Sequence, residues 1–383
     1  MLPVGEYRSA SIIHAGFECS THKRRDGTRL DLLRSTQHDR WTKQDFLRLR
    51  AFDIRTVRTG ARWHLIEPSP GHYDFSSLQP FLEAAAECGM ELLLDLLHFG
   101  WPDFIDIFSP QFVDSFADYT YAFTKFLRPL RTCCNTIAPV NEVSFFSWAG
   151  GDVAAIGPYA VDRGHELKRM LVGAAIASSN ILLNELEGIR LLSPEPVIHI
   201  IGNPDIPGDE VEAENYGRAQ YQVWDMLSGT LFREVGGRPE YLDVIGCNFY
   251  PRNEWVHNAT VSLERSDPRY KPFHLILQEV WDRYRRPLLV SETGTEDDER
   301  GDWFNYVADE VKKAHKLGIP VHGVCLYPIL NHPGWVDDRY CCNGLFDYAD
   351  ENGHRVIHEP LAAAIRRQHS ELLRSYENLN VLQ

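Results

Sequence analysis

The stretch Thr136-Ile137-Ala138-Pro139-Val140-Asn141-Glu142 is a short apolar run that ends abruptly at an amide and a carboxylate. A second run of this kind, Leu289-Val290-Ser291-Glu292, ends at another glutamate 150 positions later. Short runs of Val, Ile and Leu are typical of buried parallel strands, whose C-terminal ends are where the chain meets solvent. We therefore expect both glutamates to lie at strand ends, where a carboxylate can act on a ligand.

Strand-like and helix-like segments alternate along the rest of the chain. The expected strands are Ser11–Phe17, Ile54–Thr59, Glu91–Leu97, Thr136–Asn141, Val197–Ile201, Leu242–Asn248, Pro287–Ser291 and Val321–Tyr327. The expected helices are Thr42–Phe52, Leu78–Cys88, Gln111–Leu130, His165–Glu187, Glu212–Val235, Phe273–Tyr284, Trp303–Lys316 and Pro360–Arg374. Strands that alternate with helices favour parallel pairing, and eight such units favour closure into a barrel.

The alternative fold is an open, doubly wound sheet. It is less consistent with the sequence, because no Gly-x-Gly-x-x-Gly follows the first expected strand. No Pro/Ser-rich linker or low-complexity tract divides the units. We predict an α/β fold of the (β/α)8 TIM-barrel class, formed as a single catalytic domain by residues 1–383.

Composition and charge exclude several classes of partner. The net charge of -15 disfavours a nucleic-acid backbone or an anionic membrane surface. No apolar stretch is long enough to cross a bilayer, and the N-terminus lacks the pattern of a signal peptide, so we expect a cytoplasmic protein. The eight cysteines do not form spaced Cys-x-x-Cys pairs, and we expect no metal site.

Polar and aromatic side chains gather at or just beyond the expected strand ends. They are Arg58, His98, Asn141, Glu142, Asn248, Tyr250, Glu292, Tyr327 and Trp335. In such a barrel the C-terminal rim of the strands carries the active site. Glycoside hydrolysis needs one carboxylic acid and one carboxylate, while amides, imidazoles and aromatic faces suit sugar hydroxyls and rings. We expect Glu142 and Glu292 to be catalytic and the other seven residues to bind substrate.

Seven sequence motifs resemble those of glycoside hydrolase family 1 and occur in the same order. This is the β-glucosidase and 6-phospho-β-glycosidase family of the retaining barrel glycosidases. The motifs are Val57-Arg58 with Trp63–Pro68, His98-Phe99, Asn141-Glu142, Asn248-Phe249-Tyr250, Ser291-Glu292-Thr293-Gly294, Trp335 and Gly344-Leu345-Phe346. The resemblance implies a retaining β-glycosidase with Glu142 as acid/base and Glu292 as nucleophile. It also implies a carbohydrate substrate and no cofactor.

The chain departs from that family's pattern where the sugar is recognised. The family has a Gln at the end of the first strand, where this chain has Glu18-Cys19-Ser20-Thr21-His22, and Val143 stands where a Pro usually follows the acid/base. Tyr327–Asn331 replaces a Trp-Ser-Leu-x-Asp-Asn run, and Gly334 replaces a sugar-binding Glu. We therefore expect an altered sugar specificity.

Other interpretations of these residues remain open. The chain could be a transglycosidase that uses the same two glutamates, or a non-catalytic barrel that binds a sugar or a partner. Arg58 and His98 could be structural, and Trp63 and Trp101 could belong either to the core or to the site. The basic loop His22-Lys23-Arg24-Arg25 could favour an anionic substrate group or simply be a solvated loop.

Overall fold

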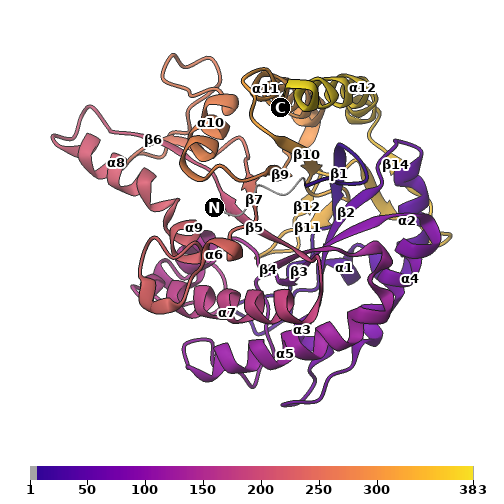
Figure 1. Cartoon of the computed structure of the whole chain (residues 1–383). Coiled ribbons are helices and arrows are strands. Elements are labelled where there is room, and N and C mark those ends of the chain that lie inside the picture. The colour runs from indigo at the N-terminus through magenta and orange to yellow at the C-terminus, as the bar shows by residue number, and fades with distance from the viewer. Residues whose placement is uncertain (1–6, 383) are drawn as a thin grey trace.

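Eight parallel strands close into a barrel in the computed structural model, which describes residues 7–382 (Figure 1). Around the barrel the strand order is β1, β10, β9, β7, β5, β4, β3 and β2, and β2 closes on β1. The strands are β1 (Ile13–Gly16), β2 (Thr56–Gly60), β3 (Glu91–Leu97), β4 (Thr136–Val140), β5 (Arg190–Pro196), β7 (Val244–Asn248), β9 (Leu288–Thr293) and β10 (Val321–Leu326). The predicted (β/α)8 TIM barrel is confirmed.

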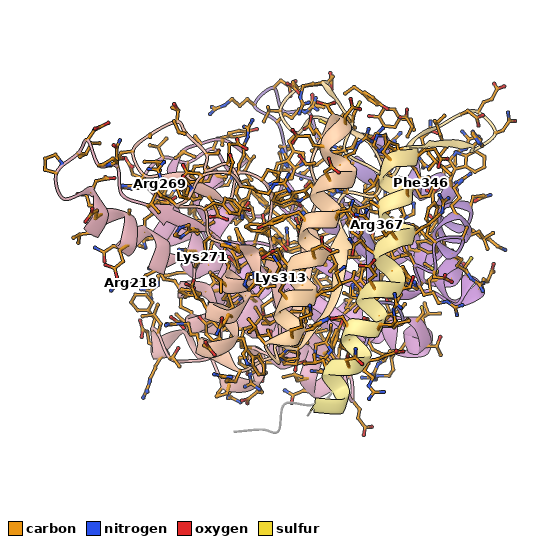
Figure 2. The ribbon with its side chains drawn as sticks, turned by 90° about the horizontal axis from the view of Figure 1, so that it is seen from above. Arg218, Arg269, Lys271, Lys313, Phe346 and Arg367 are labelled. Atoms are coloured by element: carbon orange, nitrogen blue, oxygen red, sulfur yellow. The ribbon has the colours of Figure 1, made fainter. Side chains whose placement is uncertain are left out.

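Helices surround this barrel (Figure 1). The longer ones are α2 (His38–Arg50), α4 (Gln79–Cys88), α5 (Gln111–Leu127), α7 (Gly164–Glu185), α8 (Asp209–Ala219), α10 (Phe273–Tyr284), α11 (Arg300–Lys316) and α12 (Glu359–Leu382). Figure 2 shows α11 and α12 side by side, with Lys313 labelled on one and Arg367 on the other. Within residues 7–382, none of the helices has both the length and the apolar character needed to cross a membrane.

Shorter elements complete the rim and the loops. Three two-stranded sheets lie outside the barrel: β6 (His199–Ile201) with β8 (Glu254–Val256), β11 (His332–Pro333) with β12 (Tyr340–Cys341), and β13 (Phe346–Ala349) with β14 (Arg355–Ile357). The short helices are α1 (Leu32–Ser35), α3 (Trp63–Ile66), α6 (Val143–Phe146), α9 (Gln222–Leu227), η1 (Phe75–Ser77), η2 (Arg128–Cys133), η3 (Ser147–Asp152), η4 (Arg233–Val235), η5 (Pro239–Tyr241) and η6 (Asp297–Glu299).

The fifth barrel strand corrects the sequence-based expectation. We expected Val197–Ile201, but the barrel strand is β5, and His199–Ile201 pairs with β8 outside the barrel. The sequence of β5 contains Pro194 and Pro196, which have no backbone N–H to donate and so read as a loop. The barrel accommodates them because β5 pairs with β4 only through Arg190 and Leu191, at the start of the strand.

Apolar packing confines any ligand to one end of the barrel. Its interior is filled by a buried cluster to which five strands contribute one side chain each: Leu93, Ala138, Leu192, Val244 and Leu289. On the outside, α5 buries Phe112, Phe116, Tyr119 and Phe123, which recur every three or four residues along one face. A filled interior leaves the C-terminal rim of the strands as the place for a site.

Candidate active site

The two glutamates lie together at the C-terminal rim of the barrel. Glu142 is separated from β4 by Asn141 alone and directly precedes α6, while Glu292 is the penultimate residue of β9. Their exposed fractions are 8% and 4%, and both line a single cavity of about 250 Å³. The other residues lining this cavity are Glu18, His98, Phe99, Phe145, Pro196, Tyr250, Asn253 and Trp335. The sequence placed Glu142 and Glu292 at strand ends, and the structure brings them into one cavity.

Glu292 is held by a cation and a phenol. Arg58 Nη1 donates to Glu292 Oε1 at 2.6 Å, and the Tyr250 hydroxyl donates to Oε2 at 2.8 Å. Burial raises the pKa of Glu292, and the positive charge of Arg58 opposes that shift. Both oxygens of the carboxylate are therefore fixed by donors that favour its ionised form.

Arg58 is buried, and every N–H of its guanidinium has an acceptor. Besides Glu292, the group donates to both oxygens of Asp95, at 3.1 and 2.7 Å, to Asn141 Oδ1 at 2.6 Å and to the Ser291 carbonyl at 3.1 Å. A guanidinium with five fixed donors is a rigid fork that orients its partners. Arg58 thus joins β2, β3, β9 and the end of β4 beneath the cavity.

Glu142 is in a different electrostatic setting from Glu292. Asn248 Nδ2 donates to Glu142 Oε1 at 2.7 Å, and Asn248 Oδ1 accepts from the Ser291 hydroxyl at 2.6 Å. Burial, together with the negative charge of nearby Glu292, raises the pKa of Glu142 to about 8. Glu142 therefore holds a proton at neutral pH, and because Oε1 accepts from Asn248 that proton belongs on Oε2.

His98 connects the cavity wall to the Arg58 network. Its Nδ1 lies 2.9 Å from Asp95 Oδ2, and its Nε2 lies 3.1 Å from Asn141 Nδ2. Because Asn141 Oδ1 already accepts from Arg58, the amide nitrogen faces His98 and donates to it. Asp95 accepts from Nδ1, and although burial lowers the pKa of His98, the neighbouring Cys19 and Asp95 raise it above the usual range.

Asp95 is a site residue that the sequence analysis missed. It is fully buried in β3, between leucines, and it is the common acceptor for Arg58 and His98. The signal was a charged residue inside the apolar run Leu92–Leu97, because a buried carboxylate without a partner is strongly unfavourable.

Two residues at the cavity have left-handed backbone conformations. Phe99 has a φ of 62° and Glu142 a φ of 45°. L-residues with side chains of this size avoid that region, and such residues cluster at functional sites where surrounding structure holds them in place. At Glu142 the peptide N–H donates to the Pro194 carbonyl at 3.0 Å, which helps to hold this turn.

Trp335 forms an aromatic wall of the cavity and is anchored by the basic loop. Its ring centroid lies 5.3 Å from that of Phe99 and 6.0 Å from that of Phe145. Arg24 donates to the backbone carbonyls of Trp335 and Gly334, at 3.3 and 2.8 Å. The charge of Arg24 therefore supports the position of Trp335.

Tyr327 and the other two candidate tryptophans lie away from the cavity lining. Tyr327 is buried behind it, with its ring centroid 5.5 Å from the Arg58 guanidinium carbon. Trp63 is fully buried and stacks on Tyr119 at 5.1 Å, so it belongs to the core. Trp101 packs at 6.0 Å from Phe146 and donates to a backbone carbonyl.

Glu18 is a third carboxylate in the cavity. It lies just beyond β1 and is 7% exposed. Its Oε1 accepts from the Ser20 peptide N–H at 2.8 Å and from the Ser20 hydroxyl at 2.5 Å, and it lies 3.9 Å from His98 Nε2. Glu18 begins the stretch that departs from the family 1 pattern, and its place in the cavity was not predicted from the sequence.

Among the described residues, two groups of side chains contain potential metal ligands. Cys19, Asp95 and His98 form one, and Asp209, Glu212 and His257 the other, each with potential ligand atoms within 4.8 Å of one another. In the first group both Asp95 oxygens already accept from a buried guanidinium, which a metal cation would have to displace. This group fits a hydrogen-bond network better than a metal centre.

Comparisons with known sequences give one partial match. The family model described as beta-galactosidase of glycoside hydrolase family 42 matches residues 34–96, which extend from α1 to the end of β3. No curated protein matches the sequence.

Solved structures match nearly the whole chain. The family 1 β-glucosidase from Thermotoga maritima superposes with a TM-score of 0.75 at 13% identity, over 96% of this chain and 98% of that chain. A hyperthermophilic β-glucosidase mutant gives 0.76 at 14% identity, over 94% and 100%. The AHE enzyme from Alicyclobacillus herbarius gives 0.73 at 15% identity, over 89% and 88%. This likeness shows that the chain has the barrel fold found in family 1 β-glucosidases.

Proposed function

We propose that the protein is a retaining glycoside hydrolase that cleaves a β-glycosidic bond, with Glu142 as acid/base and Glu292 as nucleophile. The observation that carries the proposal is the contrast between two buried carboxyls in one cavity. Glu292 is bound by Arg58 and Tyr250, whereas Glu142 faces an amide and has its pKa raised to about 8. One carboxyl bound by a cation and a second carboxyl with a strongly raised pKa suit the nucleophile and the acid/base of this reaction.

The first step uses both carboxyls at once. Glu142 gives its proton to the glycosidic oxygen, so the leaving group departs as a neutral alcohol. Glu292 attacks the anomeric carbon and forms a glycosyl ester. Arg58 and Tyr250 hold the attacking carboxylate in one orientation throughout.

The second step reverses the role of Glu142. Once Glu292 is esterified it carries no charge, so the repulsion that raised the pKa of Glu142 is removed. Glu142, now deprotonated, accepts a proton from water as that water attacks the anomeric carbon. The ester bond breaks, Glu292 is released as a carboxylate, and the sugar leaves with its original β configuration.

Transfer to an acceptor other than water is a second candidate function. It is favoured by a cavity of about 1090 Å³ that adjoins the sugar cavity and shares Phe145, Pro196 and Asn253 with it. A bound acceptor alcohol there could replace water in the second step. Product analysis with and without an added alcohol separates hydrolysis from transfer.

Azide rescue tests the assignment of the two glutamates. Glu142→Ala and Glu292→Ala are assayed on a panel of dinitrophenyl β-glycosides with gluco, galacto, manno, fuco and 6-phospho sugars, with Glu83→Ala, an exposed site, as control. We expect azide to give a β-glycosyl azide with Glu142→Ala and an α-glycosyl azide with Glu292→Ala. The opposite assignment, or full activity in either variant without azide, would refute the proposal.

A further inference from the structure

The larger cavity lies on the leaving-group side of the proposed reaction. It is lined by Ser144 and Phe145, which follow Glu142 on α6, and by residues of α7, α8 and β8. Because Glu142 is the proposed proton donor to the leaving group, the space beside α6 is where an aglycone would extend. This inference rests on the proposed function. Figure 1 shows α6, α7, α8 and α9 on the same side of the barrel.

Aromatic side chains from separate elements line this cavity. Trp148 and Tyr216 have exposed fractions of 44% and 42%, and Trp255 is half-buried. The rings of Phe145 and Trp148 lie 5.9 Å apart, and those of Tyr216 and Trp255 lie 6.1 Å apart at 82°. Exposed aromatic walls around a concave space suit a flat, largely apolar ligand ring.

The cavity also contains a lysine with an unusual environment. Lys168, on α7, is half-buried, and its Nζ donates to Gln222 Oε1 at 2.9 Å. Within the described part of the chain, no carboxylate oxygen lies within 4.0 Å of this amine. The other lysines either form an ion pair, as Lys125 does with Glu185, or are exposed, as Lys316 is.

The surroundings of Lys168 leave its charge incompletely compensated. Burial lowers the pKa of Lys168, which shows that the ammonium has lost hydration, although Glu195 and Asp152 partly oppose this shift. Asp152 accepts from the Gly164 peptide N–H at 2.6 Å, and Glu195 accepts from the Ser144 N–H at 2.9 Å. Both carboxylates thus accept hydrogen bonds from backbone N–H groups rather than from Lys168. An anionic ligand group would gain a charge-assisted hydrogen bond from Lys168.

We propose that this cavity binds an aromatic aglycone that carries a carboxylate, of the hydroxycinnamate or hydroxybenzoate class. The ring packs among Phe145, Trp148, Tyr216 and Trp255, and the carboxylate pairs with Lys168. The aglycone's phenolic oxygen forms the glycosidic bond and points to Glu142. A neutral aromatic of the same shape keeps the packing and loses only the ion pair.

Direct binding tests this site without any need for turnover. Calorimetry measures 4-hydroxycinnamate and the neutral 4-hydroxycinnamamide binding to the wild-type protein, Lys168→Met and the exposed control Lys316→Met. We expect the acid to bind the wild type and Lys316→Met about tenfold more tightly than the amide, as one charge-assisted hydrogen bond implies. In Lys168→Met this preference is lost and amide binding is unchanged.

Equal affinity for the acid and the amide in the wild type would overturn the proposal, as would a preference that survives in Lys168→Met or no binding of either compound. If any of these occurred while the glutamate variants behaved as expected, the hydrolase assignment would stand and only the aglycone class would fall. If the acid bound as expected but azide rescue failed, the cavity would be a binding site in a protein of another function.

Discussion

Arg58 donates to Glu292 across 2.6 Å beneath the cavity that contains both glutamates, while neither oxygen of Glu142 accepts from a cation within the described residues. The two carboxyls are similarly buried but have different electrostatic environments. The cation opposes the effect of burial at Glu292, whereas at Glu142 burial and a negative neighbour act in the same direction.

Replacing Arg58 tests its effect on Glu292. In Arg58→Met the effect of burial on Glu292 is opposed less strongly, because only Tyr250 and His98 still act against it, so the pKa of Glu292 rises further and the acid limb of kcat/KM moves to higher pH. We expect kcat/KM at its optimum to fall by roughly 10²- to 10³-fold, as for loss of one electrostatic stabiliser. The pH dependence of kcat/KM measures both effects.

The matched control is Arg355→Met. Arg355 is equally buried and bound to an aspartate, Asp45, but it lies outside the cavity lining. Arg58→Met removes the guanidinium from Asp95 and Glu292 and should lose about 3–5 kcal/mol of unfolding free energy, whereas in Arg355→Met Asp45 keeps its ion pair with Arg48 and the loss should be smaller. Only Arg58→Met should move the acid limb, and an equal shift in Arg355→Met would contradict this role of Arg58.

The raised pKa of Glu142 should make stability depend on pH. The folded protein keeps this proton up to a pH of about 8, whereas an ordinary glutamate loses it near 4.5. The folded state therefore binds more protons between these values, and stability falls as pH rises from 4.5 to 8. Glu142→Gln removes this loss and should gain on the order of 3 kcal/mol over wild type at pH 8, but little at pH 4.

Chemical denaturation at several pH values measures this effect, with the exposed Glu83→Gln as control. A gain in Glu142→Gln that is the same at pH 4 and pH 8 would show that Glu142 is not protonated in the folded state at neutral pH.

Glu18 should influence Glu292, the proposed nucleophile. Its negative charge adds to the effects that raise the pKa of Glu292, so Glu18→Gln should lower that pKa and move the acid limb of kcat/KM to lower pH. Arg58→Met and Glu18→Gln should thus shift the same limb in opposite directions. A pH profile of Glu18→Gln that coincides with the wild type would exclude this coupling.

Trp335 and Arg24 should affect substrate binding more than chemistry. Trp335→Phe keeps an aromatic wall, whereas Trp335→Ala removes it and should raise KM about tenfold. Arg24→Met removes the hydrogen bonds that Arg24 donates to the carbonyls of Gly334 and Trp335. It should give a smaller rise in KM with kcat nearly unchanged. Steady-state kinetics separates the two parameters, and a large fall in kcat in Arg24→Met would instead indicate wider disruption of the rim.

The sequence predicted the fold well where strands are apolar. Glu91–Leu97 and Phe273–Tyr284 have the same bounds in the structure as in the sequence-based prediction. The prediction was wrong at β5, because Pro194 and Pro196 lack backbone N–H groups and are typical of a loop. The strand tolerates them because it pairs with β4 only at its first two residues. The expected helix Glu212–Val235 is also interrupted, because α8 ends at Ala219 and α9 at Leu227.

The candidate site was predictable only in part, because spacing in sequence does not reveal which side chains meet. Strand ends identified both glutamates, Arg58, His98 and Tyr250, which meet in and beneath the cavity. Asp95 lies inside β3 rather than at its end, and its role depends on contacts with β2 that no local pattern reports. Glu18 stood out only as an unexpected residue, and its position in the cavity needed the three-dimensional fold.

Covalent labelling tests the central assignment most directly. The protein is treated with 2,4-dinitrophenyl 2-deoxy-2-fluoro-β-glycosides of gluco, galacto and manno configuration, digested and mapped by mass spectrometry. We expect one fluorosugar per chain on Glu292, formed as dinitrophenol is released, and no label in Glu292→Gln. A label on Glu142, Glu18 or another residue, or turnover of the parent glycoside with no covalent intermediate, would contradict the account.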